Sequence, residues 1–264
     1  MVRDTRDTEQ SVVTEQKAKV TLYWLEKSRS QRILWLLEES KVNYEVKTYK
    51  RQRLLAPPEL KKIHPLGKAP IISIESETTP EPIVLVESGL VTEYLIDHFA
   101  PRLAPKRYAD GKEGQLGGET ESWMRYRYYM NYAEGSLMPY LLISLLVNGI
   151  KSNTPFFIKP ITNMITGMIE SRVLVPNYKT HFDFLESQIA SSPDGGEYLC
   201  GPELSGADIM MSFPLGVAKD RVPVFTQENH PKLWAYVARI EGLEAFKRAV
   251  QKIVDIDGTY DATI

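Results

Sequence analysis

Hydrophobic and polar positions change their period several times in the first hundred residues. Apolar residues alternate with polar ones from Val20 to Tyr23, which predicts a β-strand, and the apolar positions that follow recur at helical spacing up to Leu37. Three strand-like runs come next, at residues 44–48, 71–74 and 83–86. A helical pattern begins directly after the third run. The predicted order is β-α-β, a connecting segment and then β-β-α. A helix between two strands favours parallel pairing, and a short hairpin loop favours antiparallel pairing.

Helical spacing dominates the second half of the chain. Four segments carry it, at residues 119–147, 177–191, 204–219 and 231–253. The stretch at residues 148–176 is less regular because Pro155 and Pro160 interrupt it. Between the two halves lies a run rich in Pro, Gly, Lys and Asp, which is typical of a linker.

These patterns divide the chain into four parts. The first residues are polar, of mixed charge and without a hydrophobic period, so we expect them to be disordered. The expected parts are a tail at residues 1–19, an α/β domain at 20–101, a linker at 102–118 and an all-α domain at 119–264.

Composition excludes several function classes. The 264 residues carry a net charge of −2, so no electrostatic signature of a nucleic-acid partner is present. The longest apolar stretch, at residues 137–147, is interrupted by polar residues and is too short to span a bilayer; we expect no integral membrane segment and see no anchor. Cys200 is the single cysteine, which permits no internal disulfide and no thiolate cage for a metal. With no targeting pattern at the start, a reducing, cytoplasmic location is expected.

Ala69-Pro70 lies in a turn directly before an apolar strand. Proline is unusual inside a central strand, whereas a cis peptide bond in a turn would explain it, since such bonds are nearly always X–Pro. A cis bond would leave the Ala69 N–H and C=O free to pair with an extended peptide, as an added strand does. The alternative is an ordinary trans proline at the start of a strand.

Two further polar clusters stand where a strand meets a helix. At Glu87-Ser88, Ser88 is a natural N-cap, and the helix N-terminus beside it suits a carboxylate. Since Glu87 suits an ammonium group, the pair matches the headgroup of an amino acid. Ser28-Arg29-Ser30 places hydroxyl groups at the opening of the first helix. Simple helix capping is the alternative for both clusters.

Taken together, the motifs resemble the glutathione transferase superfamily. The run from Ser28 to Glu39 resembles the first-helix motif of its serine-type members, and residues 57–70 resemble the loop that holds the cis-proline. Glu87-Ser88 resembles the pair that binds the γ-glutamyl group. In the second half, Ser205 and Asp208 resemble the buried capping box of the family. The resemblance covers about residues 20–250 and is closest to the fungal, yeast-like branch.

The resemblance implies a thioredoxin-like α/β domain that binds glutathione, followed by an all-α domain. It implies a transferase for detoxification that acts on hydrophobic electrophiles, with glutathione peroxidase activity on organic peroxides as a side reaction, in a homodimer. The catalytic residues would be Ser28 and Arg29. The glutathione-binding residues would be Ser28, Lys68, Ala69, Pro70, Glu87 and Ser88, with Arg51 and Arg53 as alternative cations for the glycyl carboxylate. Tyr126, Tyr129 and Met130 are expected at the mouth of the acceptor site, although aromatic side chains at this spacing also form cores.

The implied chemistry requires glutathione to be held as a thiolate, which is the reactive form of a thiol. Lowering a thiol pKa by about two units from about 8.5 takes about 2.7 kcal/mol. A hydrogen bond from Ser28 to a charged sulfur supplies about 1.5–3 kcal/mol, and the helix N-terminus about 0.3–1 kcal/mol. These contributions suffice without a metal. Arg29 would add positive potential, or would bind the second substrate instead; Ser30 is the remaining candidate.

Three features limit the resemblance. Many relatives have Asn before the Ser-Arg-Ser motif, where this chain has Lys27, and no tyrosine stands at the usual hydroxyl-donor position. Because the first domain contains no cysteine, thiol transfer through a protein cysteine is disfavoured, and Cys200 is expected to be a packed core thiol. The alternative functions are a non-catalytic regulatory or binding protein of the same fold, and a ligand-carrying or membrane-associated protein.

Overall fold

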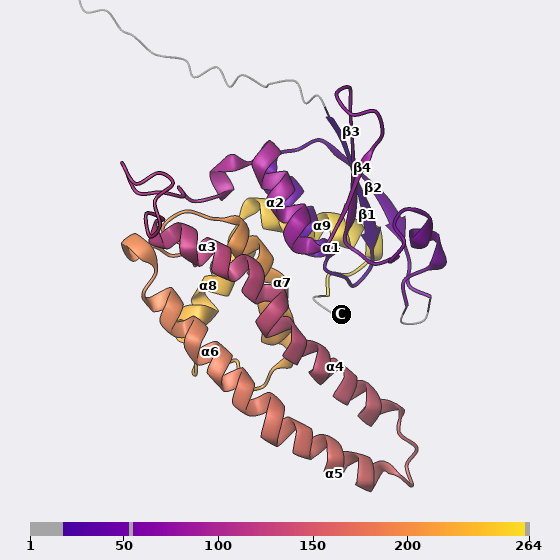
Figure 1. Cartoon of the computed structure of the whole chain (residues 1–264). Coiled ribbons are helices and arrows are strands. Elements are labelled where there is room, and N and C mark those ends of the chain that lie inside the picture. Colours follow the sequence, from indigo (N-terminus) through magenta and orange to yellow (C-terminus); the bar gives the residue numbers. More distant parts are fainter. Residues whose placement is uncertain (1–17, 53–54, 262–264) are drawn as a thin grey trace, which may run out of the picture.

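The computed structural model describes residues 18–52 and 55–261 of the chain (Figure 1). The expected tail at residues 1–19 lies outside the described residues except for Ala18 and Lys19, which form the start of the first strand. A small sheet with its helices makes up the first half of the chain, and long helices make up the second half.

The sheet has four strands in the order β2-β1-β3-β4. Its members are β1 (Ala18–Leu25), β2 (Tyr44–Tyr49), β3 (Ile71–Ser76) and β4 (Ile83–Val86). β1 and β2 are parallel because α1 (Ser30–Ser40) crosses between them, and the β1–β3 and β3–β4 pairs are antiparallel. The chain then enters α2 (Ser88–Phe99). The predicted mixed α/β topology is therefore confirmed.

The second half of the chain is helical, as predicted. Its helices are α3 (Glu121–Tyr132), α4 (Met138–Asn153), α5 (Lys159–Ile169), α6 (Val175–Ala190), α7 (Gly206–Arg221), α8 (Pro231–Gly242) and α9 (Glu244–Asp257). Single π-helical turns at Ala133–Leu137 and Glu170–Leu174 join α3 to α4 and α5 to α6. The region 148–176, which looked irregular, is almost entirely helical. Pro155 lies in the turn and Pro160 in the first turn of α5, where a proline removes no hydrogen bond.

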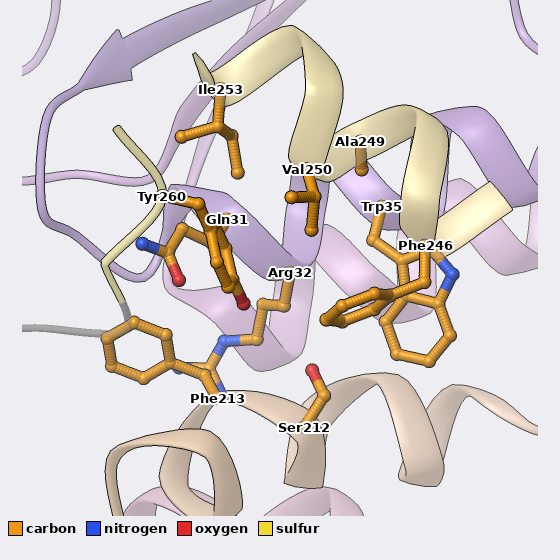
Figure 2. A pocket seen from close by; sticks show the side chains of 10 residues that line it. All are labelled: Gln31, Arg32, Trp35, Ser212, Phe213, Phe246, Ala249, Val250, Ile253 and Tyr260. Atoms are coloured by element: carbon orange, nitrogen blue, oxygen red, sulfur yellow. The ribbon is translucent and has the colours of Figure 1, made fainter. Parts of the chain in front are cut away.

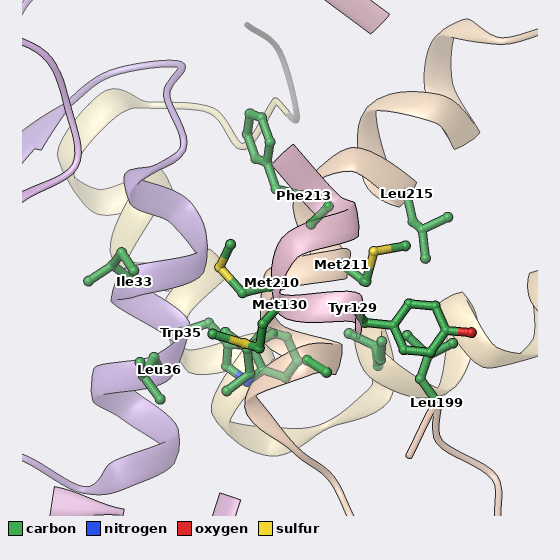
Figure 3. Close-up of a cluster of buried hydrophobic side chains, with 14 of the residues drawn as sticks. Ile33, Trp35, Leu36, Tyr129, Met130, Leu199, Met210, Met211, Phe213 and Leu215 are labelled. Atoms are coloured by element: carbon green, nitrogen blue, oxygen red, sulfur yellow. The ribbon is translucent and has the colours of Figure 1, made fainter. Parts of the chain in front are cut away.

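One hydrophobic core runs through both halves of the molecule (Figure 3). Trp35 and Leu36 of α1 belong to it, together with Met210 and Met211 of α7 and Met130 of α3. All of them are buried. Because α1 packs on α7 and α9, the first helix of the α/β domain is also a core element of the helical domain.

The predicted capping box is present at the start of α7. The backbone N–H of Ser205 donates to Asp208 Oδ2 at 2.8 Å, and the serine side chain in turn accepts from the third residue of the helix. Asp208 is fully buried and also accepts from Leu199 N and from the hydroxyl of Tyr236. The box therefore ties the preceding loop and α8 to the start of α7.

The continuous helical unit Glu121–Asn153 is long and apolar enough, by composition, to cross a membrane. The first half of this unit is part of the folded protein. Arg125 pairs with Glu121, and Arg127 pairs with Glu93. Tyr129, two residues after Arg127, is fully buried. We therefore treat α3 as a core helix rather than a membrane span.

Candidate glutathione-binding site

A pocket with about 180 Å³ of free space lies where α1, β3, α2 and the α3–α4 junction meet. The residues that line it come from four separated segments: Arg29, Leu66, Lys68, Ala69, Pro70, Val86, Glu87, Ser88 and Glu134. The fold thus brings together all the predicted binding residues except Ser28.

Ala69 and Pro70 form the wall of this pocket beside β3. Their peptide bond is cis, as the sequence predicted. Ala69 lies just outside the strand, and within the described chain its N–H and C=O make no backbone hydrogen bond. They are free to pair with the backbone of a bound peptide.

Glu87 has an unusual backbone conformation, with φ 70° and ψ 119°. This positive φ, which is strained for a residue other than glycine, turns the chain from β4 into α2. Glu87 is therefore the N-cap, and Ser88 is the first helical residue rather than the predicted N-cap. No side chain caps the helix. Its first N–H groups and partial positive charge remain available to an anion in the pocket.

Ser28 and Arg29 have different positions in the β1–α1 loop. The Ser28 hydroxyl donates to Leu25 O at 2.6 Å and accepts from Ser30 N at 3.2 Å, and the residue is only 6% exposed. Ser28 therefore closes the loop and does not line the pocket. Arg29 follows it and does line the pocket.

Glu134 was not foreseen from the sequence. It lies in the π-helical turn Ala133–Leu137 and lines the same pocket as Ala69 and Pro70. Its Oε2 is 3.3 Å from Arg29 Nε, and its Oε1 accepts from Arg32 Nη2. Arg32 is fully buried and also donates to Met210 O at 2.8 Å. Burial lowers the pKa of the Arg32 guanidinium, and the charge of Glu134 offsets this effect.

The predicted acceptor residues lie elsewhere. Tyr126, Tyr129 and Met130 are buried, and Figure 3 shows the last two within the hydrophobic core. The Tyr129 hydroxyl donates to Gln188 Oε1 at 3.2 Å. None of the three lines the pocket described above.

A second, small pocket, with about 20 Å³ of free space, lies between α1, α7 and α9 (Figure 2). Trp35, Phe213 and Phe246 give it aromatic walls, and Tyr260 stands at one side. Arg32 Nε and Trp35 Nε1 are both buried there, and neither has a hydrogen-bond partner within the described part of the chain. The pocket therefore combines apolar walls with two unused donors.

Arg51, one of the two alternative cations, does not line the first pocket. Arg51 donates to the backbone carbonyls of Glu26 and Lys27 instead. Arg53 lies outside the described residues. Among the described residues, Arg29 and Lys68 are the arginine and the lysine that line this first pocket.

Comparison with known proteins identifies the family of the chain. The family model described as "Glutathione S-transferase, N-terminal domain" matches residues 18–97, and "Glutathione S-transferase, C-terminal domain" matches residues 172–239. Glutathione S-transferase 1 of Saccharomyces cerevisiae is 33% identical over 88% of this chain and 94% of its own length. The chain belongs to the glutathione S-transferase family.

Other members of the family show the same relationship. Glutathione S-transferase 3 of Schizosaccharomyces pombe is 28% identical over 89% of this chain and 88% of its own length. A crystal structure of a glutathione S-transferase from Actinobacillus pleuropneumoniae has a TM-score of 0.63 at 28% identity, covering 92% of this chain and 95% of its own. The transferase URE2P6 of Phanerochaete chrysosporium, solved with oxidized glutathione, shares the fold with a TM-score of 0.65 at 14% identity, over 91% and 98% of the chains.

Within this glutathione S-transferase, Cys200 is a core residue. It is 3% exposed, and burial, together with the nearby charge of Asp208, raises its pKa. A buried thiol with a raised pKa is a poor nucleophile. Among the described residues there is also no group of His, Cys, Asp and Glu side chains that could hold a metal ion.

Proposed function

We propose that this glutathione S-transferase stabilises the thiolate of glutathione for attack on hydrophobic electrophiles. One observation carries the proposal: Arg29, Ala69, Glu87 and the uncapped start of α2 all line the same pocket. A tripeptide with an amino-acid headgroup, an extended centre and a thiol has a complementary group for each of them.

In this proposal each part of glutathione has its own partner. The backbone of Ala69 pairs with the cysteinyl residue as an added strand would. Glu87 binds the α-ammonium group, and Ser88 with the start of α2 binds the adjacent carboxylate. Lys68, which is exposed at the pocket wall, binds the glycyl carboxylate.

Arg29 and Ser28 stabilise the sulfur. Arg29 lines the pocket and supplies positive charge, although Glu134 compensates part of it. Ser28 can donate to sulfur only if its hydroxyl leaves Leu25 O, so it contributes after a rotation of the side chain. The thiolate then attacks an electrophilic carbon, a C–S bond forms, and the leaving group departs with its electron pair.

The same thiolate accounts for peroxidase activity. It attacks the peroxide bond, which yields an alcohol and a glutathione sulfenic acid. A second glutathione converts the sulfenic acid to the disulfide and water. This route requires no protein cysteine, in agreement with the burial of Cys200.

The test is the pH dependence of conjugation to chlorodinitrobenzene, with glutathione binding measured by calorimetry. We compare the wild type with Ser28→Ala, Arg29→Met and the exposed control Arg172→Met. We expect Arg29→Met to shift the thiolate pKa upward and lower kcat at neutral pH, while glutathione still binds. Wild type that binds glutathione but neither conjugates nor reduces peroxides would overturn the proposal, and full activity of both Ser28→Ala and Arg29→Met would overturn the assignment of these residues.

The acceptor contacts are tested by steady-state kinetics with chlorodinitrobenzene. Substitution of an acceptor contact should raise KM for chlorodinitrobenzene and leave KM for glutathione unchanged. Equal changes in both constants would contradict the assignment. The prediction of Tyr126, Tyr129 and Met130 as acceptor contacts can be tested in the same assay.

The assembly and location are proposed on the family relationship alone. We infer a cytoplasmic homodimer, since the family usually pairs the first domain of one chain with the second domain of its partner. Light scattering at micromolar concentration tests this, and a monomer mass would contradict it.

A further inference from the structure

The α4–α5 hairpin projects away from the sheet and carries exposed apolar side chains along its length (Figure 1). Leu146 and Ile150 lie one turn apart on α4. At the tip, Phe156 and Phe157 are 86% and 70% exposed. We call the exposed apolar side chains from Leu146 to Met168 the apolar hairpin face. Large exposed patches of this kind mark interaction sites.

On α5 the exposed apolar residues follow a strict helical spacing. They stand at positions i, i+3, i+4 and i+7, which are Ile161, Met164, Ile165 and Met168. This spacing is the apolar face of an amphipathic helix. In most amphipathic helices this apolar face packs on a core. In the described structure the apolar face of α5 is exposed to solvent instead.

The charges of the hairpin are all of one sign. From Met138 to Ile169 the sequence has no Asp or Glu and two lysines, Lys151 and Lys159, although the whole chain has 34 acidic residues. Lys151 pairs with Glu170 just beyond this segment. Lys159, next to the tip, is exposed and pairs with no carboxylate among the described residues. An apolar face with phenylalanines and flanking lysines has the composition of a helix that lies in the interface of an anionic bilayer.

We propose that the apolar hairpin face docks the protein peripherally on anionic phospholipid membranes, with Phe156 and Phe157 inserted at the headgroup boundary. Lys159 then lies near the lipid phosphates and carboxylates. The docked hairpin does not span the bilayer. The hairpin projects away from the sheet (Figure 1), and none of its residues from 146 to 168 lines the glutathione pocket, so docking should leave that pocket open.

A second copy of the chain fits this face less well. In a symmetric dimer the same patch meets itself. Lys159 would then face a surface that contains no carboxylate, and the two lysine-bearing faces would repel each other. An anionic bilayer supplies the missing opposite charge, which a copy of this segment does not.

The test is flotation of the full-length protein with vesicles of phosphatidylcholine alone and vesicles that also contain phosphatidylserine. We expect the wild type to bind the anionic vesicles more tightly, and binding to weaken with added salt. The Phe156→Ser/Phe157→Ser variant should bind about tenfold or more weakly. Both side chains are exposed, so the variant should keep its conjugation activity. The matched control is Leu116→Ser, which removes a fully exposed leucine outside the apolar hairpin face. This variant should bind the vesicles like the wild type.

A second measurement locates the contact directly. Because Cys200 is buried, a polarity-sensitive dye attached to Phe157→Cys reports on the tip alone, and Leu116→Cys is its control. We expect a blue shift with anionic vesicles at position 157 and none at position 116.

Several results would overturn the proposal. They are no wild-type binding to anionic vesicles, equal binding to both vesicle types, equal binding by the double variant, or equal dye shifts at the two positions. If the double variant instead halves the molecular mass in solution and binds vesicles like the wild type, the face is a chain–chain interface. None of these results depends on the reaction in the glutathione pocket.

Discussion

Glu134 accepts a hydrogen bond from Arg32 across the junction of the two domains. Arg32 belongs to α1, and Glu134 belongs to the π-helical turn between α3 and α4. The same carboxylate lies 3.3 Å from Arg29, which lines the candidate glutathione pocket. The pair therefore connects the stability of the domain junction to the position of a proposed catalytic residue.

Replacing Glu134 should destabilise the protein strongly. Glu134→Gln leaves the fully buried Arg32 without its counter-charge, a change that costs about 3–5 kcal/mol when both partners are buried and less here, because the Glu134 side chain is 32% exposed. Urea unfolding followed by circular dichroism measures it. The control is Glu197→Gln, which breaks the exposed pair with Arg239 and should cost about 0–1 kcal/mol. Equal losses for the two variants would contradict a structural role of the buried pair.

Glu87 separates a backbone effect from a side-chain effect. Glu87→Gly and Glu87→Ala both remove the proposed ligand of the α-ammonium group, so both should raise KM for glutathione. Only glycine adopts φ 70° without strain, so Glu87→Gly should be more stable than Glu87→Ala by about 1 kcal/mol. Thermal unfolding and steady-state kinetics check the two parts. If the two variants are equally stable, the backbone at this position is not strained.

His181 should make the helical domain sensitive to acid. Its Nδ1 contacts the Tyr132 hydroxyl, and burial lowers the pKa of His181 below its usual value of about 6.5. The unfolded chain binds this proton more readily than the folded chain. The free energy of unfolding is therefore not reduced by His181 above pH about 6.5, and it falls as the pH drops below that value. His181→Gln should flatten this part of the profile in denaturant titrations from pH 8 to pH 5. An unchanged slope would show that other groups cause the loss.

The thiol of Cys200 should be unreactive in the folded protein. It is buried, and burial raises its pKa, so little thiolate is present and reagents have no access to it. A colorimetric disulfide reagent should react with it only in denaturant, and Cys200→Ser should keep conjugation activity. Fast reaction of the native protein, or loss of activity in Cys200→Ser folded like the wild type, would contradict this view.

Local chemistry was readable from the sequence. The order of the elements along the chain, the parallel β1–β2 pair and the antiparallel β3–β4 pair, the cis bond at Ala69–Pro70, and the capping box of Ser205 and Asp208 were all foreseen. Each of these depends on residues close together in the chain, whose periodicity and dihedral preferences act within one or two turns. The order of the glutathione-binding motifs was readable for the same reason, because a motif is a local pattern.

The tertiary structure alone decided which partners these residues meet. The position of Glu134 depends on a π-helical turn and on the buried Arg32, which is far away in sequence. No local sequence pattern predicts either of them. The predicted helix at residues 119–147 contains both Tyr129 and Leu146, yet Tyr129 is fully buried and Leu146 is exposed. Periodicity gives the direction of a side chain on its own element. Burial depends on whether another element packs against that side, and this is settled only when distant segments compete for the same core.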